Sequence, residues 1–157
     1  MVRKVLLWPV CALAWRAGLK IFFVYTGAQS ILAGPKYQNK KMLDIFFRLK
    51  PAPRVAQNPW LLLEGFFVTG LFMAVALGLI NSRLSGHWLK KGLILGCITW
   101  MLVIPWFEFY LPYNVMNEPI LLVLFEGLLW FGVMLLVGLS ASFTLNFRLS
   151  RKLWKYR

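Results

Sequence analysis

The chain has 157 residues, of which 60% are hydrophobic and only 15% are charged, and its mean hydropathy is +0.67. A soluble domain is about 45–50% apolar and about 25% charged, so this composition excludes both an ordinary water-soluble protein and a disordered chain. The net charge of +13 comes from basic residues at the ends of apolar runs. That placement is typical of a membrane protein and argues against nucleic-acid binding.

Four apolar runs approach or exceed the length of about 20 residues that a transmembrane helix needs. They cover residues 17–34, 59–80, 92–111 and 119–143. We expect roughly the first fifteen residues to lie at the membrane surface, because one helix from residue 5 to 34 would place Arg16 deep in the bilayer. The sequence therefore predicts an all-α integral membrane protein, with four transmembrane helices in a bundle forming a single membrane domain over residues 1–157.

The connection between the first two predicted spans contains a helical pattern of its own, over residues 39–50. Its apolar side chains recur at helical spacing, and its charged side chains occupy the other faces: Met42, Ile45, Phe46 and Leu49 against Lys40, Lys41, Asp44 and Arg48. This pattern predicts an amphipathic helix that lies on the lipid surface in the first extracytoplasmic loop. Asp44 and Arg48 are four residues apart, a spacing that favours an ion pair.

The distribution of lysine and arginine predicts the orientation of the chain in the membrane. With four crossings, the N-terminal segment, the turn at residues 81–91 and the C-terminal tail carry twelve basic residues, and the opposite side carries six. Because cytoplasmic segments are enriched in basic residues, we expect a plasma (inner) membrane protein with both termini in the cytoplasm.

Three glutamates fall within the predicted spans, namely Glu64, Glu108 and Glu126. A charged side chain at mid-bilayer costs about 2.5–3.5 kcal/mol on insertion scales, so each acid must face the bundle, take up a proton or find a cation. These residues are the candidate site for a ligand or a proton. The alternative is a structural role, in pairs with basic residues of the loop or in hydrogen bonds to neighbouring polar groups. No histidine accompanies the acids, and we expect no metal site.

An aromatic cluster lies near the outer ends of the third and fourth predicted spans: Trp106, Phe107, Tyr110 and Tyr113. Tryptophan and tyrosine concentrate at membrane interfaces, so the cluster is either an interfacial belt or the wall of a pocket for a lipid tail, a quinone or a pigment ring. Small residues also recur at helical spacing, in the pairs Gly92 with Gly96 and Ala74 with Gly78, and at Gly138 with Ser142. Such strips allow close approach of a helix, from the same chain or from a partner.

No Ser/His/Asp constellation, HExxH motif, phosphate-binding loop or dinucleotide fingerprint occurs in the sequence. The sequence thus favours a non-catalytic protein without deciding the question, and it specifies no cofactor. We predict a small multi-pass membrane protein that acts by association, as an accessory or assembly subunit of a larger membrane complex. The alternative is a small carrier, or a protein that binds a lipid, quinone or pigment through the intramembrane carboxylates beneath the aromatic belt.

Overall fold

The structure, a computed structural model, describes residues 2–48, 50, 58 and 60–146. These residues form helices joined by turns, and none of them forms a strand, which confirms the predicted all-α class. In chain order the helices are α1 (Val2–Leu19), η1 (Lys20–Tyr25), α2 (Ala28–Leu32), α3 (Lys40–Phe47), α5 (Trp60–Arg83), α6 (Trp88–Glu108), η2 (Phe109–Val115) and α7 (Ile120–Asn146). Leu49 of the predicted amphipathic pattern, residue 59 at the start of the second predicted span, and the C-terminal residues 147–157 lie outside the described residues.

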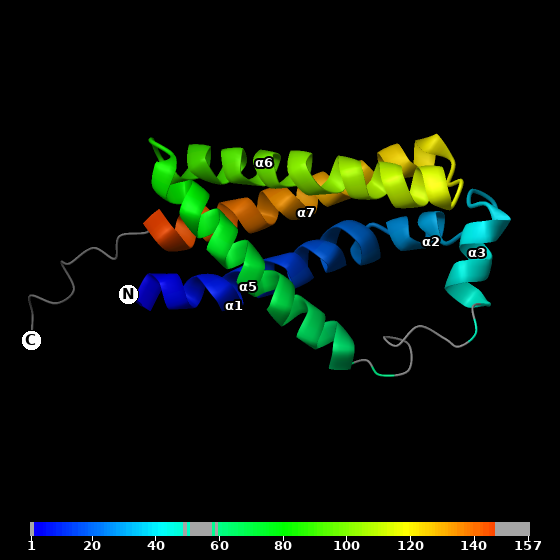
Figure 1. Ribbon diagram of the computed structural model, residues 1–157, viewed down its shortest axis with the longest axis horizontal. Helices are drawn as coiled ribbons and strands as arrows, with labels where there is room; N and C mark the ends of the chain where they lie inside the picture. The colour runs from blue at the N-terminus through cyan, green and yellow to red at the C-terminus, as the bar shows by residue number, and fades with distance from the viewer. Residues whose placement is uncertain (1, 49, 51–57, 59, 147–157) are drawn as a thin grey trace, which may run out of the picture.

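Four of the helical segments are long and apolar enough to cross a membrane: Val5–Tyr25, Trp60–Arg83, Trp88–Val115 and Ile120–Asn146. The start of α1, the connection between α5 and α6, and the end of α7 lie at one end of the molecule, while α2, α3 and η2 lie at the other (Figure 1). The chain therefore has the features of a multi-pass membrane protein. The last three segments overlap the predicted spans closely.

The first segment differs from its prediction. The long helix begins at Val2 and continues through η1 to Tyr25, so residues 5–16 belong to it and the range 17–34 is not one helix. The helix is broken at Gly27, whose backbone is left-handed with φ of 73°, a conformation that glycine adopts without steric cost. The Thr26 hydroxyl donates to the Phe22 carbonyl at 2.6 Å and satisfies a backbone group at this break. Arg16 consequently lies about 13 Å along the helix from Tyr25.

Helices α6 and α7 pack closely because glycines line their contact. A Cβ on Gly138 would lie 2.5 Å from the Gly96 backbone nitrogen and 2.6 Å from the Gly92 carbonyl oxygen. Real Cβ atoms do not approach backbone so closely, so any side chain at Gly138 forces the helices apart. The strip of small residues on these helices therefore packs within the chain.

Helix α1 lies between α5 and α7 and joins them. Gly70 of α5 packs directly against Ala12, and Gly18 packs against Val133 of α7. Ala74 contributes to the same core, which is completed by Leu7, Cys11, Ala14, Leu77, Leu95, Val137 and Ala141. Helix α5 crosses α1 obliquely (Figure 1) and makes few contacts with α6 and α7. This arrangement leaves a cleft along α1 beside the first half of α5.

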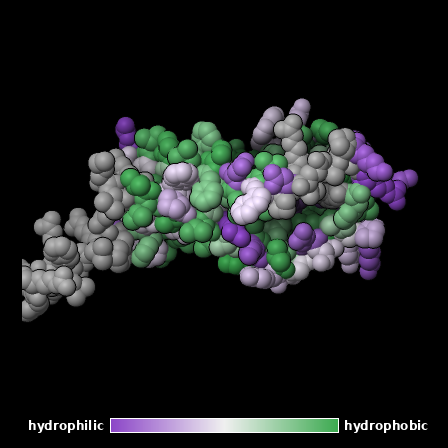
Figure 2. All heavy atoms as spheres, turned by 90° about the horizontal axis from the view of Figure 1, so that it is seen from below, coloured by the Kyte–Doolittle hydropathy of each residue, from purple (hydrophilic) through white to green (hydrophobic). Residues whose placement is uncertain are grey.

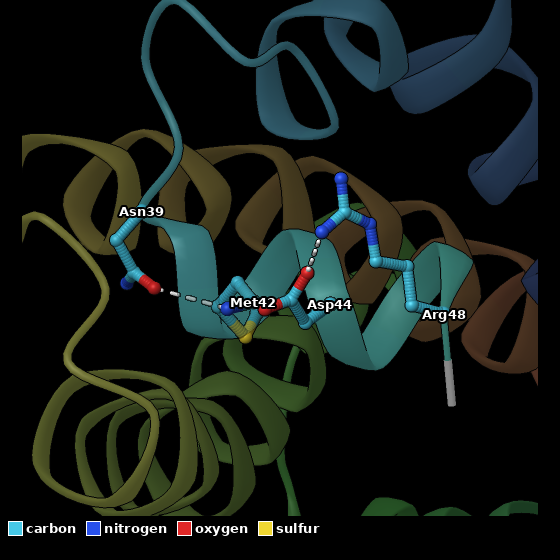
Figure 3. A network of polar contacts seen from close by, with 4 residues as sticks. All are labelled: Asn39, Met42, Asp44 and Arg48. Carbon is cyan, nitrogen blue, oxygen red and sulfur yellow. Dashed lines mark hydrogen bonds and ion pairs between the residues drawn. The ribbon is translucent and has the colours of Figure 1, made fainter. Parts of the chain in front are cut away.

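The connection that carries α3 is fixed to the loop before α7. The Asn39 side chain caps α3 by accepting from the Met42 backbone N–H at 2.9 Å, and its amide nitrogen donates to the Asn117 carbonyl at 2.6 Å. The predicted ion pair between Asp44 and Arg48 is present at 3.2 Å (Figure 3). Helix α3 thus lies at the same end of the molecule as the loop before α7.

Candidate functional site

Trp130 on α7 is the centre of the candidate site. Its ring lies 5.5 Å from that of Trp15 and 5.2 Å from that of Phe23, both on the first long helix. Its indole N–H points to Glu126, one turn earlier on α7, at 3.4 Å from Oε1. At the contact between the first long helix and α7, the Trp130 side chain therefore also holds the carboxylate of Glu126.

Three glutamates lie close together around this tryptophan. The carboxyl group of Glu108 lies close enough to those of Glu126 and Glu118 to interact with both electrostatically. The exposed fractions of Glu108 and Glu118 are only 3% and 2%. The Oε2 atom of each of these two residues is buried without a hydrogen-bond partner. Buried carboxylate oxygens that lack a partner are costly, so these two atoms make the region a candidate functional site.

Glu118 lies in the loop between η2 and α7, where Gln38 reaches it from the first connection. The Gln38 amide nitrogen donates to Glu118 Oε1 at 2.6 Å and to the Leu32 carbonyl at 3.2 Å. Burial raises the pKa of Glu118 above its ordinary value of 4.5, and the hydrogen bond from Gln38 offsets part of that rise. Two loops distant in sequence are thereby joined through one carboxyl group.

A cleft lined by the first long helix, α5 and α7 adjoins these residues. Its larger part, of about 520 Å³, is lined by Arg16, Lys20 and Glu126 among apolar side chains such as Phe66. Its smaller part, of about 310 Å³, is lined by Gln38, Glu118 and Glu126. Phe23, Gln29 and Glu126 line both parts, so the two parts adjoin each other. Seen from below, hydrophilic side chains interrupt an otherwise hydrophobic surface (Figure 2).

Charged side chains that form no ion pair line the cleft. Two of them, Arg16 and Lys20, lie on a helix of membrane-spanning length. Within the described part of the chain, the only ion pair between side chains is that of Asp44 and Arg48. Arg16 and Lys20 therefore line the same cleft as Glu126 without forming an ion pair with it. Cations within a transmembrane segment usually face a cavity or pair with an anion, and Arg16 and Lys20 face this cleft.

The predicted site residues separate into two groups. Glu108 and Glu126 lie together, but Glu64 is exposed on α5 and does not join them. Sequence reasoning missed Arg16, Lys20, Gln38, Glu118 and Trp130 as site residues. The spacing of Arg16, Lys20 and Phe23 places them on one helix face, and that signal would have identified them once the first helix was placed correctly. Among the described residues, no group of three or more His, Cys, Asp or Glu side chains is arranged to hold a metal ion.

The four predicted aromatic residues lie on the outside of α6 and η2. Trp106 stacks on Tyr110 at 5.1 Å, and Tyr113 stacks on Phe109 at 5.0 Å. Trp106, Phe107, Tyr110 and Tyr113 are all exposed. None of them lines the cleft described above. Their exposure at one end of a membrane-length helix is typical of an interfacial belt.

No protein-family model, no curated protein and no solved structure matches this chain.

Proposed function

We propose that the chain is a multi-pass membrane protein that binds an amphipathic molecule with an anionic headgroup in the cleft beside α1. Its four long helices cross the bilayer as a bundle, and α3 lies on the extracytoplasmic surface. The observation that carries the proposal is the presence of Arg16 and Lys20, without an ion pair to any described carboxylate, on an otherwise largely apolar cleft wall. A lipid was also the ligand of the alternative predicted from the sequence, but that alternative assigned its binding to intramembrane carboxylates beneath the aromatic belt, and here Arg16 and Lys20 bind the headgroup.

Each part of the cleft suits one part of such a ligand. The two cations offer charge-assisted hydrogen bonds to a phosphate or carboxylate, which offset the cost of placing them at membrane depth. Leu62, Phe66 and Val24 offer apolar surface to the hydrocarbon chain. The smaller part of the cleft offers the carboxylates of Glu118 and Glu126, which accept hydrogen bonds from a headgroup hydroxyl or ammonium.

The proposal is tested by measuring lipid retention in mild detergent by native mass spectrometry. Phosphatidylglycerol is the anionic probe and phosphatidylcholine is the reference lipid. We expect the double variant Arg16→Gln/Lys20→Gln to bind phosphatidylglycerol about tenfold more weakly than the natural chain, which corresponds to about 1.4 kcal/mol. The matched control is Arg83→Gln/Lys90→Gln, which removes two exposed cations that do not line the cleft.

The control should retain the binding of the natural chain. The proposal is wrong if the two double variants retain the anionic lipid equally, or if phosphatidylcholine binds as tightly as phosphatidylglycerol. Thermal unfolding of each variant in the same detergent verifies that the fold is intact.

The role of an accessory or assembly subunit stays a prediction. One observation that favoured it now has another explanation, because the small-residue strips of Gly92, Gly96 and Gly138 are buried in the contact between α6 and α7. Gly78 and Ala74 likewise face α1 rather than a partner.

A further inference from the structure

The cleft beside α1 carries positive and negative side chains that do not neutralise one another. Arg16 and Lys20 line its larger part, and Glu126 lines both parts. No ion pair joins them, so the charged nitrogen atoms of Arg16 and Lys20 lie more than 4.0 Å from the carboxylate oxygens of Glu126. The cleft therefore offers one position for an anionic group and another for a cationic group.

The two kinds of charge are separated along the cleft. Helices α1 and α7 run in opposite directions, since α1 begins at the end of the molecule where α7 ends (Figure 1). Side chains of a helix tilt toward its N-terminus, so those of Arg16 and Lys20 tilt away from α2, and that of Glu126 tilts toward α2. The smaller part of the cleft, which Leu32 of α2 lines, accordingly includes Glu126 but neither cation. A ligand that satisfies both charges has its cationic group nearer to α2 than its anionic group.

The surroundings of Glu126 suit an ammonium group. Phe23, Phe66 and Trp130 line the same part of the cleft as this carboxylate. The face of an aromatic ring attracts a cation that lies within about 6 Å of the ring centre. Among the described residues, only the Trp130 indole hydrogen-bonds to Glu126, and it does so at Oε1. The Oε2 atom of Glu126 is therefore free to accept from a ligand.

The hydrogen-bond acceptors beside these rings favour an ammonium group that carries N–H bonds. The side-chain carbonyl of Gln29 is a second acceptor, because this exposed residue also lines both parts of the cleft. A primary ammonium group brings three N–H donors to Glu126 and Gln29, whereas a trimethylammonium group brings none. Hydrogen bonds between charged partners are about twice as strong as neutral ones, so the carboxylate discriminates between the two kinds of ammonium.

We propose that the ligand of the cleft is a phospholipid whose headgroup carries a primary ammonium group, with its phosphate at Arg16 and Lys20 and its ammonium at Glu126. The inference rests on the proposed function, because the same two cations bind the phosphate. It adds the group that Glu126 recognises, and with it the class of phospholipid, of which phosphatidylethanolamine is the simplest member. A trimethylammonium headgroup places methyl groups against the carboxylate and leaves the Oε2 atom of Glu126 without a partner.

The test compares phosphatidylethanolamine, its N-methyl and N,N-dimethyl derivatives, and phosphatidylcholine, all with the same acyl chains. The four lipids share the phosphate and the positive charge and differ in the number of N–H donors. Their retention by the full chain is measured by native mass spectrometry in mild detergent. We expect phosphatidylethanolamine to bind about tenfold more tightly than phosphatidylcholine, with the two derivatives in order between them. Equal affinity across the series, or tightest binding of phosphatidylcholine, overturns the proposal.

Variants assign each end of the headgroup to its residues. Glu126→Gln keeps the shape of the side chain and removes its charge, so the affinity ratio of phosphatidylethanolamine to phosphatidylcholine should fall below about threefold. Glu64→Gln is the matched control, because Glu64 is exposed on α5 and lines neither part of the cleft, and it should keep the ratio of the natural chain. Arg16→Gln/Lys20→Gln should weaken the binding of all four lipids alike and leave the ratio unchanged.

The proposal is overturned if Glu126→Gln keeps the ratio of the natural chain. The methylation series on the natural chain decides the question by itself if Glu126→Gln does not fold. Failure of this inference and failure of the proposed function give different results. Equal affinity across the series, with loss of phosphatidylglycerol binding in Arg16→Gln/Lys20→Gln, removes only the ammonium position. Retention of phosphatidylglycerol by that double variant removes the function proposed for the cleft.

Discussion

Glu118 shows how a single buried carboxyl group ties together distant parts of this chain. Its Oε1 atom accepts from Gln38, eighty residues earlier, and its Oε2 atom is buried without a partner. The residue before it, Asn117, has a left-handed backbone with φ of 57°, which turns the chain back toward α3. A local conformation that asparagine tolerates thus positions the acid beside the cleft.

The raised pKa of Glu118 predicts that stability depends on pH in a defined direction. Below pH 4.5 the carboxyl group is protonated in both the folded and the unfolded chain. As the pH rises, the unfolded chain loses this proton first, so the free energy of unfolding decreases until the pH has passed the pKa of the folded state. Thermal unfolding in detergent between pH 4 and 8 should show a midpoint that falls more in the natural chain than in Glu118→Gln.

Glu64→Gln is the matched control for that measurement, because it replaces an exposed carboxyl group on α5. Glu108 and Glu126 are present in both variants and interact electrostatically with Glu118, so the difference between the variants reports Glu118 together with its effect on these two neighbours. Identical pH profiles for Glu118→Gln and Glu64→Gln contradict the assignment.

The composition of the site was only partly predictable from the sequence. Glu108 and Glu126 stand out because acids within apolar runs are rare, and the same reasoning also selected Glu64, which lies apart from them. Hydropathy reports how deep a residue lies along a helix but not which way it faces. Gln38 and Glu118 lie in connections, where polar residues are expected, so nothing in the sequence marked their contact.

Helices α6 and α7 approach closely because Gly92, Gly96 and Gly138 have no side chains at their contact. The Ser142 hydroxyl of α7 donates to the Trp88 carbonyl of α6 at 2.7 Å. The Asn146 side-chain amide of α7 donates to the Asn81 side chain of α5 at 3.2 Å. These bonds join three helices at one end, where the glycine contact brings the backbones together. Close packing and hydrogen bonding therefore reinforce one another.

We predict that Gly138→Ala destabilises the protein by about 1–3 kcal/mol, because the added methyl group would overlap the backbone of α6. The measurement is the midpoint of thermal unfolding in detergent. Gly127→Ala is the control on the same helix, since its Cβ meets nothing within 4 Å and alanine favours the helix. Equal midpoints for the two variants would show that α6 and α7 do not approach as closely as the structure places them.

The boundaries of the first long helix were the least predictable element. Arg16 and Lys20 interrupt its apolar run. If each residue is given its own free-energy cost of insertion into the bilayer, the predicted span begins near Arg16, because a longer span would bury that charge. The structure shows that both side chains face a cleft shared with Glu126, so their neighbours differ from those of a lone charge in lipid. The other three spans contain one acid each and were placed within a few residues, although the third continues to Val115 through η2.

The longer first helix reduces the excess of basic residues on the side of the termini without reversing it. Arg16 and Lys20 now lie inside the first long helix, which leaves ten basic residues on the side of the termini and six on the side of α3; three of the ten, Arg83, Lys90 and Lys91, lie in the terminal turns of α5 and α6. The start of α1, the turn after α5 and the end of α7 lie at the same end of the molecule (Figure 1). Since the larger basic excess faces the cytoplasm, both termini should be cytoplasmic.

Cysteine labelling tests this orientation in intact cells. In a Cys11→Ala/Cys97→Ala background, a membrane-impermeant maleimide should label Ser30→Cys directly and Ser85→Cys only after the membrane is permeabilised. Both serines are exposed, and they lie in α2 and in the α5–α6 turn, at opposite ends of the molecule. The reverse pattern would invert the orientation, and labelling of both sites from outside would contradict a crossing by α5. Glu118 and the lysines of α3 lie at the α2 end, so the expected pattern also places them on the outer side of the membrane.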